Sequence, residues 1–148
     1  MYRFFLAVFL GVSIFGNAQK LDDNLFKKMS IRNIGPAGMS GRVTAIDVVR
    51  KDPKIIYIGT ASGGVWKSTS EGLKWEPIFE KESTQSIGAI AINQNNSDEI
   101  WAGTGEGNPR NSMNCGDGIY KSLDAGKTWK NMGLKATKTI HRVIIHRD

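Results

Sequence analysis

The sequence is poor in residues that stabilise small folds through covalent or metal links. It has one cysteine, Cys115, so no disulfide can form within the chain. Its two histidines, His141 and His146, lie five residues apart on an expected strand and therefore point to opposite faces. These features exclude a disulfide scaffold and a local histidine metal site, and we expect no metal and no cofactor.

Clustered charge of one sign is also missing. The chain carries 20 Lys and Arg against 14 Asp and Glu, a formal net charge of +6. The positive excess is spread along the chain, whereas a nucleic-acid interface requires a basic stripe or patch. The sequence therefore predicts no nucleic-acid partner.

Long apolar runs are absent except at the start, where Phe4–Phe15 is apolar apart from two small residues. This run is shorter than the roughly 20 residues that a membrane-spanning helix needs. It follows Arg3 and precedes Gly16-Asn17-Ala18, which is the order of a secretory signal peptide. We therefore expect residues 1–18 to be cleaved, the mature chain to have no membrane span, and the protein to be periplasmic, at the cell surface or extracellular.

Glycine, in contrast, is abundant, with 17 residues, and the chain repeats itself. Ile56–Thr60 matches Ile100–Thr104 at a distance of 44 residues, and Gly64–Ser68 matches Gly118–Ser122 at a distance of 54. The second unit therefore carries an insertion of ten residues between its second and third expected strands, in the segment 105–117. Insertions into a repeat usually form loops, often on the binding face.

Each unit is expected to contain four short strands separated by Gly, Asn, Asp or Ser. The expected strands are Val43–Val49, Ile55–Gly59, Gly64–Ser68 and Lys74–Ile78, then Ile87–Ile92, Ile100–Gly103, Gly118–Ser122 and Thr128–Met132. Four antiparallel strands in about 45 residues are typical of a β-propeller blade. The sequence predicts an all-β fold, with a lead-in segment at 19–40 and a partial propeller at 41–148. Its blades lie at about 41–79 and 86–134, a third begins near Ile140, and further blades belong to a longer protein.

The segment Ser122-Leu123-Asp124-Ala125-Gly126-Lys127-Thr128-Trp129 follows the pattern S-x-D-x-G-x-T-W. It resembles the Asp-box, or BNR, repeat of sialidases, sortilin-type propellers and related exported propellers. In this interpretation the residues are structural, because the carboxylate accepts hydrogen bonds from the turn and glycine supplies a positive φ. The structural set is Ser122, Asp124, Gly126, Thr128 and Trp129, and Ser68–Trp75 is a degraded copy.

The wider chain is similar to large exported bacterial proteins described as sortilin-like or as glycosyl hydrolases with BNR repeats. The resemblance rests on Arg32–Ala37, Ser40–Val43, Gly59–Ser68 and Gly103–Asn108. It implies a propeller longer than this chain. It leaves open a binding platform for protein, peptide or glycan ligands and, as the alternative, a glycoside hydrolase with further catalytic groups on other blades.

The inserted loop is the expected functional loop. Because strands alternate in direction, Arg42, Glu106, Asn108, Arg110 and Asp117 are expected on one face. The first four are candidate ligand-binding residues. Glu106 and Asp117 are weak candidates for a catalytic pair, since glycoside hydrolysis normally uses two carboxyl groups. In the alternative interpretation, Glu106 caps a turn and Asp117 closes the base of the loop.

Two departures from hydrolase patterns favour the binding platform. Xyloglucan-degrading propeller enzymes place an Asp just before a Gly-Gly-aromatic strand in the first blade. The matching position is Ala61, which precedes Ser62-Gly63-Gly64-Val65-Trp66 and has no carboxyl group. The arginine cluster and tyrosine nucleophile of sialidases are also not present as a complete set.

Overall fold

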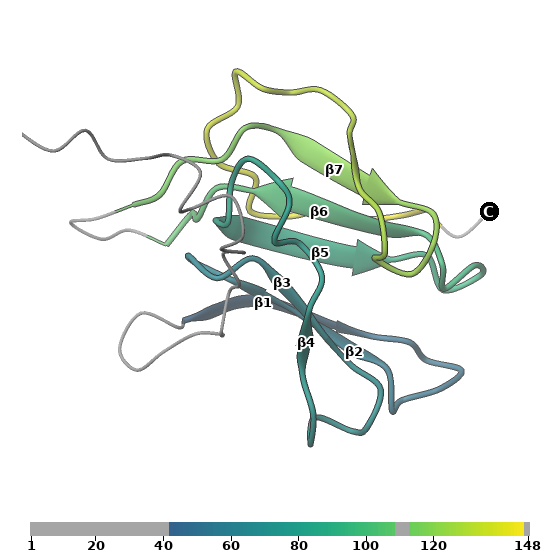
Figure 1. Cartoon of the computed structure of the whole chain (residues 1–148). Coiled ribbons are helices and arrows are strands. Elements are labelled where there is room, and N and C mark those ends of the chain that lie inside the picture. Colours follow the sequence, from purple (N-terminus) through teal and green to yellow (C-terminus); the bar gives the residue numbers. More distant parts are fainter. Residues whose placement is uncertain (1–41, 109–112, 147–148) are drawn as a thin grey trace, which may run out of the picture. The chain divides into compact units, whose positions relative to one another are not determined.

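A computed structural model describes residues 42–108 and 113–146 (Figure 1). The expected signal peptide, the lead-in segment and Arg110 lie outside these residues. The described part is all-β and contains no helix. Accordingly, no helix long and apolar enough to cross a membrane occurs in the described part of the chain.

The strands form two four-stranded antiparallel sheets, each arranged in chain order. We name them blade 1 and blade 2. Blade 1 contains β1 (Val43–Val48), β2 (Ile56–Thr60), β3 (Val65–Ser68) and β4 (Glu76–Pro77). Blade 2 contains β5 (Ile87–Ile92), β6 (Ile100–Thr104), β7 (Ile119–Ser122) and β8 (Lys130–Asn131). The predicted all-β class with four-stranded propeller blades is confirmed.

The two blades have the same register. Ile58 of β2 lies between Ile46 and Trp66, as Ala102 of β6 lies between Ile90 and Tyr120. A register irregularity also occurs at the matching place in both first strands, between Val43 and Ala45 and between Ile87 and Ala89. The internal repeat of the sequence is therefore a repeat of backbone pairing.

The outer strands are shorter than the sequence predicts, since β4 and β8 have two residues each. The turns before them are closed by side chains. The N–H of Lys74 donates to Ser70 Oγ at 2.9 Å and the N–H of Thr128 donates to Asp124 Oδ1 at 2.8 Å. These donors are not in the ladder, so pairing with the third strand begins only after the turn.

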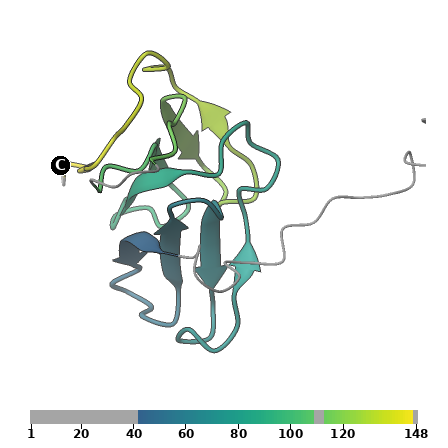
Figure 2. The same ribbon diagram turned by 90° about the vertical axis from the view of Figure 1, so that its left-hand side faces the viewer.

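The blades pack closely because β2 and β6 each contain a glycine at the contact. A Cβ atom on Gly59 would lie 2.5 Å from Ile87 Cγ2 and 3.2 Å from Ile90 Cδ1, inside normal contact distances. β5 of blade 2 accordingly lies against β1 and β2 of blade 1, as the two views of the sheets show (Figures 1 and 2).

Ile140 repeats this contact on blade 2. A Cβ atom on Gly103 would lie 2.5 Å from Ile140 Cγ2, and the N–H of Ile140 donates to Thr104 O at 3.0 Å. Residues 140–146 lie in no strand, whereas the sequence predicts a strand that begins at Ile140. A strand needs a hydrogen-bonded neighbour, and the part of the chain described here contains no further strand to pair with it.

The link between the blades supplies a central part of the core. Phe79, which is 1% exposed, makes edge-to-face contacts with Tyr120 and Trp129 at centroid distances of 5.1 Å. Trp129 Nε1 also donates to Ile78 O at 2.7 Å. Trp129 therefore packs between the blades.

Candidate functional site

The turn between β7 and β8 is built around one carboxylate. Asp124 Oδ1 accepts hydrogen bonds from Thr128 N and Ser122 Oγ, both at 2.8 Å, and its Oδ2 accepts from Thr128 Oγ1 at 2.5 Å. Gly126, at φ 88°, donates its N–H to Ser122 Oγ at 2.9 Å. The carboxylate thus binds groups of its own turn.

The same turn is anchored to blade 1. Ala125 O accepts hydrogen bonds from Tyr57 Oη at 3.3 Å and Lys67 Nζ at 3.2 Å. Burial, and then the negative charge of Asp98, raise the pKa of Tyr57 to about 12, so this phenol is a donor. These contacts give the turn an inter-blade role.

We expect acidification to weaken this turn. The hydrogen bonds from Thr128, followed by that from Ser122, hold the pKa of Asp124 at about 2, below the ordinary value near 4. Because the pKa is lower in the folded state, the carboxylate stabilises the protein above about pH 4, and this stabilisation is lost as the pH falls towards 2. Asp124→Asn should therefore lower the melting temperature at pH 6 and have little effect near pH 2.

The measurement is a series of thermal melts between pH 6 and pH 2. It uses the intact natural protein, which here means the longest natural polypeptide that contains these residues. Glu71→Gln is the control, because Glu71 lies in the matching turn of blade 1, where Ser70 takes the place of Asp124. A difference between Asp124→Asn and the unmodified protein that stays constant across this range would contradict the prediction.

At the other end of the strands, Arg42 and Glu106 form an ion pair between the blades. Arg42 Nη2 lies 2.5 Å from both carboxylate oxygens of Glu106, and Arg42 Nε lies 3.0 Å from Oε1. The Glu106 side chain is 0% exposed and that of Arg42 is 33% exposed. Arg42 precedes β1 of blade 1 and Glu106 follows β6 of blade 2, so the pair joins the two blades at one rim.

The backbone holds Glu106 in place as well. Its N–H donates to Ser86 Oγ at 3.0 Å and to Asn114 O at 3.2 Å, and Ser86 Oγ donates to Asn114 O at 3.0 Å. The backbone of Arg42 is held too, because its carbonyl oxygen accepts a hydrogen bond from Ala61 N at 3.0 Å. Ala61 is 2% exposed, so the position where the xyloglucanase pattern has a carboxyl group is a buried methyl group beside Arg42.

Asp117 has a separate set of partners. Its Oδ2 accepts hydrogen bonds from Ser83 Oγ and, at 2.8 Å, from Tyr120 Oη. Its backbone N–H donates to Thr104 Oγ1 at 2.9 Å and its carbonyl accepts from Asn131 Nδ2 at 3.1 Å. Burial and the nearby Asp117 raise the pKa of Tyr120, which keeps the phenol protonated as a donor. Asp117 thus joins the base of the loop to β7 and β8.

The structure places the predicted site residues in different surroundings. The structure brings Arg42 and Glu106 together, gives Glu106 and Asp117 different partners, and leaves Asn108 exposed. His141 packs on the loop, because a Cβ atom on Gly107 would overlap the His141 ring.

Ser83, Ser86 and Asn114 bind the two loop carboxylates or their backbone, yet the sequence does not single them out as site residues. The sequence offers one signal for Ser86. It directly precedes the first strand of blade 2, as Arg42 directly precedes the first strand of blade 1. Serine at that position carries no charge and no motif that marks it as functional.

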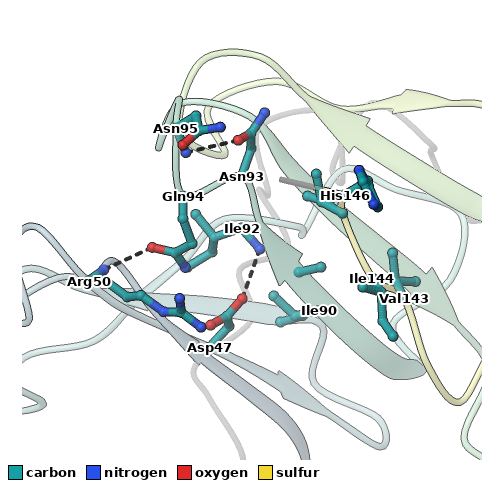
Figure 3. A pocket seen from close by; sticks show the side chains of 12 residues that line it. Asp47, Arg50, Ile90, Ile92, Asn93, Gln94, Asn95, Val143, Ile144 and His146 are labelled. Carbon is teal, nitrogen blue, oxygen red and sulfur yellow. Dashed lines mark hydrogen bonds between the residues drawn. The ribbon is translucent and has the colours of Figure 1, made fainter. Parts of the chain in front are cut away.

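A hollow of about 370 Å³ lies at the ends of β1 and β5 that are farther from the Arg42–Glu106 ion pair (Figure 3). Residues 143–146 complete its wall. Asp47 Oδ2 accepts a hydrogen bond from Ile92 N at 2.8 Å. Gln94 accepts one from Arg50 N at 2.9 Å and donates one to Val48 O at 3.0 Å. Asp47 and Gln94 therefore connect blade 1 to blade 2, and none of the predicted site residues lines this hollow.

Metal-binding groups do not gather in the part of the chain that the structure describes. Residues 42–108 and 113–146 contain no group of three or more His, Cys, Asp or Glu side chains placed to hold an ion. Cys115 is a free, exposed thiol in the inserted loop.

Comparison of the structure with solved structures agrees with this architecture. An ancestral GH74 enzyme is similar over 69% of this chain, with 21% identity and a TM-score of 0.52. The GH74 enzyme of Niastella koreensis is similar over 62% (22% identity, TM-score 0.49), and YCF48 of Cyanidioschyzon merolae over 67% (22% identity, TM-score 0.46). The similar regions are 14%, 14% and 26% of those chains.

These neighbours are β-propeller proteins, and the likeness is one of fold. The chain spans about 14% of the length of the GH74 enzymes that it resembles. No protein-family model matches the sequence, and no curated protein matches it. The class of protein that the fold defines is therefore a β-propeller repeat protein, of which the described residues form two blades.

Proposed function

We propose that the protein is an exported propeller of the sortilin-like, BNR-repeat group that acts as a binding platform. In this proposal residues 1–18 are a signal peptide, and the ligand is a protein, peptide or glycan. It binds on the rim that carries Arg42 and Asn108. Arg110, which lies outside the described residues, is the remaining predicted ligand-binding residue. Glu106 takes part by holding the guanidinium of Arg42.

The Arg42–Glu106 ion pair is the observation that supports binding over hydrolysis. A general acid or base must reach the reacting atoms and change protonation state during the reaction. Glu106 is fully buried, and both its carboxylate oxygens lie 2.5 Å from one guanidinium nitrogen. The Arg42 side chain is 33% exposed and Asn108 is exposed, and guanidinium and amide groups carry N–H donors that suit the carboxylate, carbonyl and hydroxyl oxygens of a peptide or glycan.

A glycoside hydrolase remains the second candidate, motivated by the likeness of fold to an ancestral GH74 enzyme. It requires that Asp117, or groups on other blades, supply the acid and base. Asp117 has one buried oxygen, Oδ1, without a hydrogen-bond partner among the described residues, so this carboxylate is less fully engaged than that of Glu106.

The two functions are separated on the intact natural protein. A glycan and peptide array is screened first, and the best ligand is then titrated against Asn108→Ala and Arg110→Ala. We expect each substitution to weaken binding about tenfold, which is about 1.4 kcal/mol, without changing the melting temperature. Asn95→Ala is the control, because Asn95 is exposed and lies on the turn between β5 and β6, at the end of blade 2 opposite to Asn108.

Turnover of soluble polysaccharides, including xyloglucan, is measured in parallel. Release of reducing ends that Asp117→Asn lowers by about 10²–10⁴-fold would identify a hydrolase and contradict the binding proposal. Unchanged affinity in both Asn108→Ala and Arg110→Ala would show that the ligand site lies elsewhere.

A further inference from the structure

Basic residues occur throughout the chain, whereas acidic residues do not. Residues 42–124 contain nine Lys and Arg against eleven Asp and Glu. Residues 125–146 contain five Lys and Arg and no Asp or Glu. The positive charge is therefore uncompensated in one segment, which comprises the end of the β7–β8 turn, β8 and the link that follows it.

Four lysines of this segment lie at the outer edge of blade 2. β8 is the edge strand of this blade farthest in order from β5, which packs on blade 1, and it contains Lys130. Lys127 lies in the turn before β8, and Lys135 and Lys138 lie in the link after it, which is the yellow-green trace above β7 in Figure 1. All four residues are exposed. We call Lys127, Lys130, Lys135 and Lys138 the basic edge.

The backbone that carries the basic edge is fixed to the rest of blade 2. The N–H of Met132 donates to Ile119 O at 2.7 Å, which holds the end of β8 against β7. At the far end of the link, Lys138 O accepts a hydrogen bond from Gly116 N at 2.7 Å. The spacing of the lysine Cα atoms is therefore set before any ligand arrives, so binding does not have to order the chain.

No acidic side chain of the described residues neutralises the basic edge. The ion pairs within 42–108 and 113–146 are Arg42–Glu106 and Lys121–Glu99, and none of the four ammonium groups takes part in them. Three residues span at most about 11 Å, so the Cα atoms of Lys127 and Lys130 are about one Debye length apart in physiological salt, as are those of Lys135 and Lys138. The fields of these charges therefore overlap and attract anions.

The repeat shows that the fold does not require this charge. Lys130 of β8 pairs with Lys121 as Glu76 of β4 pairs with Lys67, so the matching position of blade 1 has the opposite sign. Residues 71–86, which form the same edge of blade 1, contain two Lys and four Glu. The basic edge is therefore a feature of blade 2 alone, and mutual repulsion of its lysines does not stabilise the fold.

We infer that the basic edge binds an acidic polysaccharide, a chain whose carboxylate or sulfate groups recur along its length. The ammonium group of lysine is a point charge, which attracts such groups without demanding a fixed geometry of each. The ligand lies along β8 and the following link. This inference goes beyond the rim site of the proposed function and does not rest on it, because none of the four lysines belongs to that site.

Nucleic acid fits this surface less well. Proteins bind single strands by stacking bases on aromatic side chains between the cations. The aromatic residue within 125–138 is Trp129, whose ring packs against Phe79 and whose Nε1 donates to Ile78 O. A duplex is read by a helix or a β-ribbon that enters a groove, and β8 has only two residues.

Titration of the intact natural protein with polygalacturonate, which carries carboxylates, and with dextran sulfate tests this inference. Neutral dextran is the blank. We expect binding of at least one polyanion, with an affinity that falls at least about tenfold between about 50 and about 200 mM salt, because each contact releases counter-ions. Replacing all four lysines of the basic edge by glutamine should lower the affinity in about 50 mM salt at least about tenfold. Failure to bind either polyanion, or equal binding of dextran, would overturn the inference.

A second variant with the same change in net charge is the matched control. It replaces four other exposed lysines by glutamine, namely Lys51, Lys54, Lys74 and Lys81. Because charges distant from the ligand are screened by salt, this variant should keep its affinity within about twofold. An equal loss of affinity in both variants would show that net charge, and not the basic edge, attracts the polyanion.

One measurement needs no variant. Acetylation of lysine side chains in the unmodified protein should be slowed by the bound polyanion at the basic edge and unchanged at Lys51 and Lys54. Uniform protection of all lysines would overturn the inference. Tighter binding of a DNA duplex than of both polyanions would also overturn it and would identify a nucleic-acid partner.

Discussion

Arg42→Met is expected to lower the free energy of unfolding by about 3 kcal/mol. The substitution leaves the carboxylate of Glu106 buried without its counter-ion, and loss of one partner of a buried pair typically costs about 3–5 kcal/mol. The lower end applies because a third of the Arg42 side chain is exposed, so water reaches part of the site. The measurement is chemical denaturation of the intact natural protein at neutral pH.

The double variant Arg42→Met with Glu106→Met is the matched control. Replacing both charges with apolar side chains of similar length removes the uncompensated carboxylate, and such replacements are often neutral or stabilising. We therefore expect the double variant to be more stable than Arg42→Met alone, with a coupling energy above about 1 kcal/mol. If the effects of the two single substitutions simply add, the ion pair contributes no interaction of its own and does not join the blades.

The ion pair also shows how far sequence reasoning reaches at the site. Alternation of strand direction is enough to place Arg42 and Glu106 on the same rim, since it fixes which loops share an end of the sheet. Their contact depends on how blade 2 is set against blade 1, and that is decided by Ile87 and Ile90 packing on Gly59. Nothing in the spacing of Glu106 and Asp117 reveals that each binds a different partner.

The fold is more predictable than the site because its signals are local. Inner strands follow from apolar runs bounded by turn residues, and their bounds differ from the sequence-based ones by one residue at most. At Gly64 and Gly118 the positive φ values of 72° and 112° make the third strand of each blade begin one residue later than the sequence predicts. The fourth strands are shorter than the sequence predicts because Ser70 and Asp124 accept hydrogen bonds from backbone N–H groups that would otherwise extend the ladder.

Phe79→Ala is expected to destabilise the protein by about 3–5 kcal/mol, the usual cost of removing a buried aromatic ring. Phe79 lies on the link between the blades, is 1% exposed, and touches the rings of Tyr120 and Trp129. Its removal leaves a cavity at the point where the link meets blade 2. Because β4 and β8 are only two residues long, backbone pairing there is too limited to compensate. The effect is measured by chemical denaturation and by loss of the near-ultraviolet circular dichroism of Trp129.

Phe79→Leu and Leu73→Ala separate the packing of this ring from a general loss of apolar surface. Leucine keeps much of the buried volume without the edge-to-face contacts, so Phe79→Leu should cost clearly less than Phe79→Ala. Leu73 is 86% exposed, and its replacement by alanine should change the free energy of unfolding by no more than about 0.5 kcal/mol. If Phe79→Ala were as mild as Leu73→Ala, the blades would be held together mainly by the glycine contacts of β2 and by the rim ion pair.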